Sequence, residues 1–474
     1  KVHTTGGNNI AIGYGAMNDT DAGSTSLGSE SNVFIGVDAG GGTWADAASR
    51  YNVGLGVATL SDALNGADGN VAIGYQTGRY VTTGDDNVFV GRQAGYDITT
   101  GGSNVLLGYQ AGDNASTLGN SIGIGYQSLG GATGSLLTGA NATVAIGYQA
   151  AGNLDGNRGN GVYIGYLAGL HSQGGGVAIG YRAMEHSSGS YSNKNVAIGT
   201  QAMQNITQDN SEHNVAIGNQ ALMGGGVTAE TSGNIAIGDG TLSSVTAATR
   251  NTAIGGLSCL SNLTTGDNNV SLGYGAGQTM TTTGDCILIG NSAGNTLDGT
   301  GPNGSIAIGH LALATHTTGA RNIAIGWEAM HDTNAGSTAQ GSSDNIFMGY
   351  QAGGGTWADV ASIQNVVIGN NSADAALSGA NYNVGMGTNV YGALTQGDAN
   401  SAFGHGSLTA LTTGGSNVAV GNGVGATMTG TSNTVLIGSS AGSAINSTDA
   451  NGTVAVGYQA LQDLTSGQNS VAVG

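Results

Sequence analysis

The sequence contains little proline and little charge. One proline, Pro302, occurs in 474 residues, and the charged residue types together make up 8%. Disordered chains depend on charge or proline to stay expanded, so we do not expect a disordered chain. Glycine supplies 91 residues but follows no three-residue period, which excludes a collagen helix. Glycine and β-branched residues at this density also disfavour α-helices.

Positive charge and long apolar runs are scarce as well. Only nine residues are Lys or Arg, and the formal net charge is −19. Phosphate binding requires clusters of cationic side chains, so we expect no nucleic-acid partner. No stretch of about 18 apolar residues occurs, and we therefore expect no membrane span.

Cysteine is nearly absent. Cys259 and Cys286 occupy different positions of repeats that are two units apart. Two rungs of a strand stack separate them by roughly 10 Å, which is beyond the reach of a disulfide. We expect two small buried residues and no oxidised framework.

One pattern, Asn-Val-x-Ile-Gly, recurs along the entire chain. Anchored on its glycine, it occurs in 26 copies, most often 17 residues apart. Asn stands four residues before the glycine in 17 copies, and a sizeable apolar residue always directly precedes it. We treat three consecutive copies as the structural anchors of the repeat: Gly74, Gly91 and Gly108, preceded by Ile73, Val90 and Leu107 and by Asn70, Asn87 and Asn104.

The repeat predicts an all-β parallel β-solenoid (β-roll) of about 26 short coils. Val-x-Ile alternates with a period of two, which indicates a half-buried strand. Glycine then bends the chain, a second short strand follows, and a Thr-Gly turn closes the unit. Such a unit buries its apolar face only by stacking on its neighbours. Asparagines at one position would then hydrogen-bond along the stack.

The predicted core is thin. The two sizeable strand residues are the only reliable large contributors to it in each coil, joined by one small residue and a variable Leu, Met or Gly. We therefore expect chains to share a core as a homotrimeric shaft. The alternative is a single-chain solenoid, because 17 to 18 residues can close one three-sided coil.

A longer period is superimposed on the short one. The segment 19–25 resembles 332–338, and 41–46 repeats as 354–359, each at an offset of 313 residues. We interpret residues 1–474 as a single repetitive solenoid. Residues 13–325 then form one super-repeat of 17 coils, and residues 326–474 form a partial second copy.

No catalytic or metal-binding constellation is recognisable. The eight His are scattered, and no zinc-type Cys/His spacing occurs. We therefore expect no enzyme, no catalytic residues and no cofactor. Gly-Asp-Asp-Asn and Gly-Asp-Asn-Asn turns at 84–87 and 266–269 could hold Ca²⁺ through carboxylate and carbonyl oxygens. A plain β-turn is the alternative at both places.

Aromatic residues are the candidates for ligand contact. Trp44 and Trp357 lie in the duplicated glycine-rich insertions, where an exposed ring could stack on a sugar. Alternatively, each Trp folds over its own coil and covers it. Tyr also recurs directly after the anchor glycine, which predicts either an interchain seam or a platform for glycans; the copies are Tyr75, Tyr109, Tyr126, Tyr148, Tyr166 and Tyr181.

The units at 70–76 and 453–461 resemble the repeat shafts of tail-fibre and surface-fibre proteins from phages and aquatic bacteria. Those proteins often end in an endosialidase-type chaperone tip. More distantly, the units resemble the head repeats of YadA-like trimeric autotransporters. The resemblance implies an extracellular fibre shaft on a virion, which presents a receptor-binding tip to a host-surface glycan or receptor. The alternative is a bacterial cell-surface adhesin or extracellular filament.

Overall fold

The computed structural model describes residues 6–18, 28–44, 47–131, 142–153, 160–171, 175–185, 194–206, 211–298, 301–333, 341–358 and 360–474. Much of the duplicated insertion at 19–25, and of its second copy at 332–338, lies outside these ranges. The chain divides into two compact units, Lys1–Asn234 and Ile235–Gly474. Each unit is a stack of parallel strands, so the predicted all-β parallel solenoid is confirmed.

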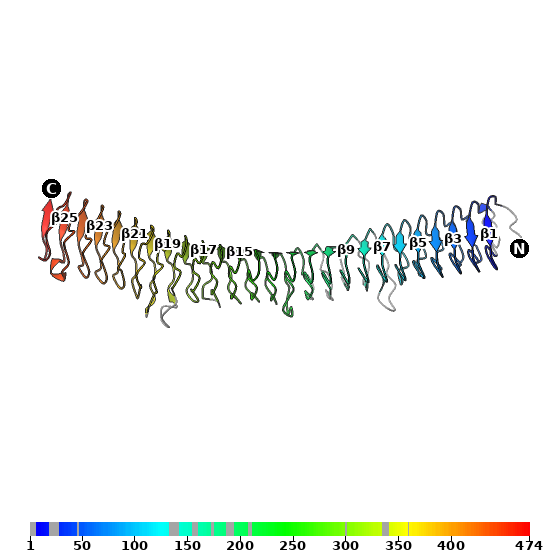
Figure 1. The fold of residues 1–474 in the computed structure, drawn as a ribbon, viewed down its shortest axis with the longest axis horizontal. Helices are drawn as coiled ribbons and strands as arrows, with labels where there is room; N and C mark the ends of the chain where they lie inside the picture. The colour runs from blue at the N-terminus through cyan, green and yellow to red at the C-terminus, as the bar shows by residue number, and fades with distance from the viewer. Residues whose placement is uncertain are drawn as a thin grey trace. The chain divides into compact units, whose positions relative to one another are not determined.

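Within the described residues, the first unit contains twelve strands of three residues each (Figure 1). They are β1 (Ile10–Ile12), β2 (Val33–Ile35), β3 (Val53–Leu55), β4 (Val71–Ile73), β5 (Val88–Val90), β6 (Val105–Leu107), β7 (Ile122–Ile124), β8 (Val144–Ile146), β9 (Val162–Ile164), β10 (Val177–Ile179), β11 (Val196–Ile198) and β12 (Val215–Ile217).

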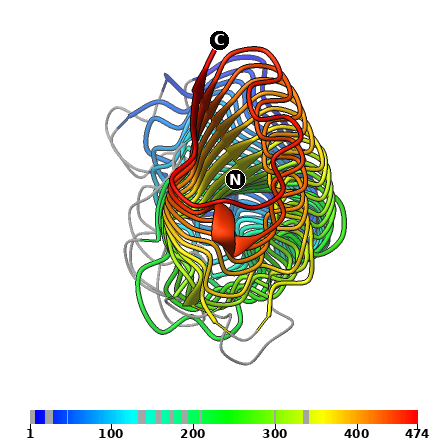
Figure 2. The same ribbon diagram turned by 90° about the vertical axis from the view of Figure 1, so that its left-hand side faces the viewer.

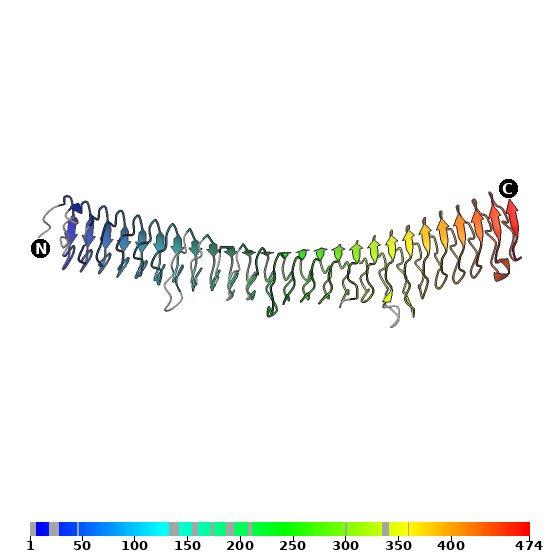
Figure 3. The ribbon, with the colours of Figure 1, turned by 180° about the vertical axis from the view of Figure 1, so that it is seen from behind.

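The described part of the second unit contains fourteen such strands, coloured green to red in Figure 3, and the 3₁₀ helix η3 (Thr448–Ala450). The strands are β13 (Ile235–Ile237), β14 (Thr252–Ile254), β15 (Val270–Leu272), β16 (Ile287–Ile289), β17 (Ile306–Ile308), β18 (Ile323–Ile325), β19 (Ile346–Met348), β20 (Val366–Ile368), β21 (Val384–Met386), β22 (Ser401–Phe403), β23 (Val418–Val420), β24 (Val435–Ile437), β25 (Val454–Val456) and β26 (Val471–Val473).

The strands of each unit pair in one register, in which equivalent positions of consecutive repeats lie opposite each other. Ile73 pairs with Val90, and Val90 pairs with Leu107. The last coils of the second unit are seen end on in Figure 2, where the strands form one side of each coil and irregular turns close the other side. Each coil therefore contributes one rung to a parallel ladder.

The anchor glycine forms the corner after every strand. Gly74, Gly91 and Gly108 have φ angles of +141°, +131° and +139°, a conformation that residues with a side chain rarely adopt. A Cβ atom added to Gly91 would lie 2.4 Å from the carbonyl oxygen of Gly108. Because the backbones of adjacent corners touch, only glycine fits, and this requirement explains why the residue repeats.

The asparagine that precedes most strands lies inside the coil and forms the predicted ladder. The Nδ2 atom of Asn87 donates to Oδ1 of Asn70 at 2.9 Å, and Asn104 repeats this bond to Asn87 at 2.9 Å. The backbone N–H of Asn87 also donates to Oδ1 of Asn70, and the backbone N–H of Asn104 donates to Oδ1 of Asn87, each at 3.1 Å. A second Nδ2 proton of Asn87 reaches the carbonyl of Gly101. The ladder thus satisfies buried polar groups along the stack.

The strand faces are reversed relative to the prediction. The middle residue of the strands between β1 and β26, such as Ala72, Phe89 or Leu106, is buried. The flanking apolar residues point outward; Ile73 is 38% exposed and Val90 is 36% exposed. The expectation that these two positions line the core is therefore wrong. The buried asparagine fixes the direction, because side chains two positions apart on a strand share a face.

No second strand follows the corner in the described part of any coil. Instead, left-handed residues alternate along the turn, as at Gln110 (φ 52°), Gly112 (φ 68°) and Asn114 (φ 58°). The N–H of Gln110 bonds Arg92 in the preceding coil, and that of Gly112 bonds Ser128 in the following coil. This side of the coil is therefore hydrogen-bonded to both neighbours without being a strand.

Each coil encloses its own core within one chain. In the coil of β6, the side chains of Leu106, Ala111, Ala115 and Leu118 are all fully buried. The turn side thus supplies large residues that the predicted thin core did not include. Cys259 and Cys286 are free and buried, as expected. Among the described residues, no helix has the length and apolarity that a membrane crossing requires.

Candidate ligand-binding surface

The two tryptophans predicted to contact a ligand are buried. Trp44 donates its Nε1 hydrogen to the carbonyl of Gly40 at 3.1 Å, and Trp357 donates to that of Gly353 at 2.9 Å. Both rings are 0% exposed and meet a strand phenylalanine edge to face, as Trp44 meets Phe34 at 5.9 Å. The prediction of ligand contact is wrong, because each indole covers the core of its own coil.

The third tryptophan is exposed. Trp327 follows the anchor glycine of β18, is 50% exposed, and stacks on His310 of the preceding coil at 4.2 Å. Next to it, a hydrogen bond from Gln351 and the nearby His331 lower the pKa of Glu328. The sequence position of Trp327 indicates that its ring is exposed, because Trp327 directly follows an anchor glycine, where Tyr recurs in other repeats.

Five tyrosines in that slot form a stacked row on the first unit, which we call the tyrosine ladder. Neighbouring rings lie 5.0–5.3 Å apart with interplanar angles of 5–12°. Four of the five rings are 42–48% exposed. Because each ring faces its neighbours, the ring edges and hydroxyl groups point to the surface instead of the ring faces. The ladder consists of Tyr109, Tyr126, Tyr148, Tyr166 and Tyr181.

An arginine extends the row toward the N-terminus. The guanidinium of Arg92 lies 5.5 Å from the ring centre of Tyr109 and 5.7 Å from that of Tyr75. Both distances fall within the range of a cation–π contact. The side chains that directly follow the anchor glycines therefore form one continuous row of contacts from Tyr75 to Tyr181.

In five successive coils, from Gln76 to Gln149, the next residue forms a parallel row of amides, the glutamine ladder. Gln127 donates from Nε2 to Oε1 of Gln110 at 2.9 Å, and Gln149 donates to Gln127 at 2.9 Å. Gln93 and Gln76 continue the same chain of bonds. An amide has two N–H donors and two acceptor lone pairs, so each rung retains hydrogen-bonding capacity.

A groove of about 360 Å³ runs beside the glutamine ladder over the coils of β6 to β9. Gln110, Gln127 and Gln149 form one wall. The floor follows the slot five residues after the anchor glycine, which is glycine in two successive coils, Gly130 and Gly152. Missing side chains at these two rungs create the hollow.

Side chains close the groove at both ends. Asp113 and Leu170 occupy the floor slot in the flanking coils, and Asn114 and Asn153 complete the polar lining. Burial, together with the neighbouring carboxylate of Asp97, raises the pKa of Asp113 to about 6. Among the described lining residues, Asp113 is the one with an ionisable side chain.

A cluster of aromatic and charged side chains adjoins the Asp113 end of the groove. The guanidinium of Arg79 donates to the hydroxyl of Tyr96 at 3.3 Å, and that hydroxyl lies 3.5 Å from the hydroxyl of Tyr80. The hydrogen bond with Tyr80 and burial raise the pKa of Tyr96. The backbone N–H of Asn114 is bonded by Asp97 at 3.1 Å. The cluster fixes the position of the groove wall at Asn114.

The turns proposed for Ca²⁺ use their carboxylates within the stack. Asp85 accepts the backbone N–H of Asp68 at 2.8 Å. Asp267 accepts both the N–H of Thr249, at 2.7 Å, and its hydroxyl, at 2.9 Å. In both places the carboxylate therefore bonds to the preceding coil. Within the described ranges, no three His, Cys, Asp or Glu side chains converge as metal ligands.

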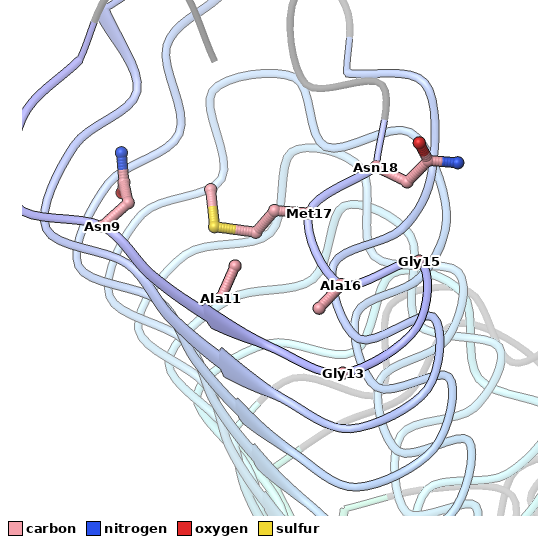
Figure 4. Close-up of a pocket in the computed structure, with 7 residues that line it drawn as sticks. All are labelled: Asn9, Ala11, Gly13, Gly15, Ala16, Met17 and Asn18. Atoms are coloured by element: carbon pink, nitrogen blue, oxygen red, sulfur yellow. The ribbon is translucent and has the colours of Figure 1, made fainter. Parts of the chain in front are cut away.

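A second cavity, of about 420 Å³, lies within the first described coil. Figure 4 shows Ala11, Ala16 and Met17 pointing into the interior of this coil. Ala11 pairs with Phe34 of β2, which is fully buried. The cavity is therefore the inside of a coil seen end on, and its lining has the character of core.

No family model matches the sequence, and no curated protein is significantly similar to it.

Proposed function

We propose that the chain is part of a structural and adhesive fibre shaft, that of a phage tail fibre or similar virion appendage that presents a receptor-binding tip. The observation that carries the proposal is the uniform register of the stacked strands, exemplified by Ile73, Val90 and Leu107. A rung bonded to both neighbours resists bending and shear without a large globular core. A bacterial surface adhesin or extracellular filament is the second candidate, because it needs the same shaft.

Self-association, as a homotrimer, forms part of the proposal. Both positions that flank the buried strand residue expose apolar side chains, so an apolar stripe follows the outer face of each ladder. Parallel sheets are normally covered on both faces, and large exposed apolar patches mark interaction sites. Copies packed through this stripe would cover the face that the single chain leaves open.

We further propose that the fibre is extracellular and not an enzyme. The low content of Lys and Arg and the net charge of −19 suit a solvated surface that resists nonspecific association. Host-surface glycans or receptors are its expected partners. No metal or other cofactor enters this proposal.

Mass measurement and electron microscopy of the purified chain test the proposal. Light scattering should give three chains per particle, and images should show fibres. A monomeric particle would remove the trimer from the proposal, and a globular particle would overturn the shaft. The sequences that flank the shaft separate the two candidates. An attachment domain and a chaperone tip indicate a virion, whereas a signal peptide and a membrane anchor indicate a cell surface.

A further inference from the structure

The tyrosine and glutamine ladders form a periodic surface along the axis of the first unit. Successive tyrosine rings are 5.0–5.3 Å apart. The stacked faces are occupied by neighbouring rings, so a ligand meets hydroxyl groups and ring edges. The glutamine row beside them repeats at the same interval, since each amide bonds the next one. A ligand that follows these rows must offer polar groups with the same repeat.

The groove adds a binding site of definite length. It spans four coils because Gly130 and Gly152 leave the floor open, while Asp113 and Leu170 end it. Its volume of about 360 Å³ lies within the range of small-molecule sites, 300–1,000 Å³. The lining combines carboxamides of Gln and Asn with glycine backbone, which is a set suited to hydroxyl groups.

Charge restricts the ligand further. Among the lining residues that the structure describes, none is Lys or Arg, and Asp113 carries the one carboxyl group. An anionic ligand would have no counter-charge and would approach a chain of net charge −19. A metal cation would find one carboxylate in the lining, fewer than protein calcium sites supply. A neutral polyhydroxylated ligand fits the lining.

The repeat distance selects an extended polymer. In sugar chains with equatorial β-1,4 linkages, each ring advances the chain by nearly the spacing of these rungs. An α-1,4-linked chain coils and loses this match. An extended peptide advances by about 3.3 Å per residue, so its side chains fall out of step with the rungs.

We propose that the groove and the two ladders bind a neutral β-1,4-linked polysaccharide laid along the axis, with one sugar ring on each rung. The hydroxyl groups of the sugars bond the amides of Gln110, Gln127 and Gln149 and the tyrosine hydroxyl groups. This inference deepens the adhesive part of the proposed function. It requires no particular tip, and the shaft stands without it.

Titration with two hexasaccharides tests the proposal. Cellohexaose, which is β-1,4-linked, and maltohexaose, which is α-1,4-linked, are titrated into the full chain and followed by NMR or calorimetry. Cellohexaose should bind at least tenfold more tightly than maltohexaose. Equal binding of the two sugars, or no binding of either, would overturn the proposal and leave the shaft function unaffected.

Two variants address the groove itself. Gly130→Leu fills the floor with a side chain that the same slot already accepts at Leu170. Gln127→Leu removes the central amide, whose bonds link both neighbouring rungs. Each variant should weaken cellohexaose binding at least tenfold. Unchanged binding in both would overturn the proposal.

Matched controls exist in the second unit. Ala426→Leu alters the same slot as Gly130, and Gln459→Leu alters a glutamine that also follows a tyrosine after an anchor glycine. Both should bind cellohexaose as the unaltered chain does. Circular dichroism checks folding, and light scattering checks mass. A change of particle mass in Gly130→Leu alone would identify the groove as a contact between chains and overturn the proposal.

Discussion

Two donors of Asn87 share one acceptor on Asn70: Oδ1 of Asn70 accepts both the side-chain and the backbone N–H of Asn87, at 2.9 and 3.1 Å. The carbonyl of Gly101 takes the other amide hydrogen at 2.9 Å. One asparagine therefore ties three consecutive coils together through buried groups.

Asn87→Ala should lower the free energy of unfolding by ~3 kcal/mol, because the buried oxygens of Asn70 and Gly101 would each lose a hydrogen-bond donor. Urea unfolding followed by circular dichroism measures the change. Asn87→Thr is the control, since Thr434 occupies the same slot and its hydroxyl donates to Asn417 at 2.7 Å. Threonine should retain part of the stability; an equal loss in both variants would contradict a role for the ladder bond.

Gly91→Ala should cost at least ~3 kcal/mol, because the new Cβ would meet the carbonyl oxygen of Gly108 at 2.4 Å and the φ of +131° is strained for alanine. Thermal unfolding gives the loss. At Gly256 nothing lies within 4 Å of an added Cβ, so Gly256→Ala should change stability by less than about 0.5 kcal/mol. Similar effects at the two glycines would show that the corner contact is unimportant.

Trp44→Ala should reduce stability by about 3–5 kcal/mol, the range for a buried aromatic residue, and leave sugar binding unchanged. Its ring is 0% exposed and packs on Phe34 at 5.9 Å. Chemical denaturation and the cellohexaose titration measure the two effects separately. Weaker binding at an unchanged melting temperature would return Trp44 to the list of ligand contacts.

His316 should make the second unit less stable in mild acid. The ring is buried between Thr333, at 3.0 Å, and the carbonyl of Gly319, at 2.9 Å. Burial lowers the pKa of His316 below its ordinary value of 6.5. The unfolded chain therefore takes up a proton as the pH falls through 6.5 while the folded chain does not, and stability is lost toward lower pH.

Urea midpoints at pH 7.5 and pH 5.5 measure this loss, and His316→Asn removes the titrating group. The difference between the two pH values should be smaller in the variant. Asp113 has the opposite sign, because burial raises its pKa to about 6 and its folded form gains stability as the pH falls. Asp113→Asn separates the two contributions. An identical pH response in the His316 variant would assign the acid sensitivity to other groups.

Val90→Lys should dissociate the proposed trimer while the isolated chain stays folded. Val90 points outward and is 36% exposed, so the charge can remain in water unless another chain covers it. Light scattering reports the mass, and circular dichroism reports the fold. Thr83→Lys is the control on the exposed turn side. Equal masses for the unaltered chain and both variants would place the contact between chains elsewhere.

The sequence was sufficient to predict the backbone plan. Anchor glycines and asparagines at constant offsets predict rungs in register, and Gly74, Gly91 and Gly108 lie in such a row. The offsets are informative because the touching corners require glycine and the buried ladder favours asparagine.

The orientation of the strand could not be predicted as readily. Val and Ile alternate with a small residue, and period two defines two faces without saying which one is inside. The buried Asn70, two positions before Ala72, identifies the inner face once its ladder is known. Hydrophobicity pointed to Ile73, which lies outside.

The groove depends on an absence that only the stack makes meaningful. Gly130 and Gly152 appear as two ordinary glycines in a glycine-rich sequence. They form a hollow because Asp113 and Leu170 occupy the same slot in the coils on either side. Alignment of the repeats on the anchor glycine, read by column, would have revealed the gap.

The corner glycines separate the length of a coil from its height. Gly165 and Gly180 are 15 residues apart, and Gly326 and Gly349 are 23 apart. In both cases the flanking strands pair residue for residue, Val162 with Val177 and Ile323 with Ile346. Repeats of 15 and of 23 residues thus both leave the next rung in place. The stack can therefore display inserted peptides of unequal size at evenly spaced positions.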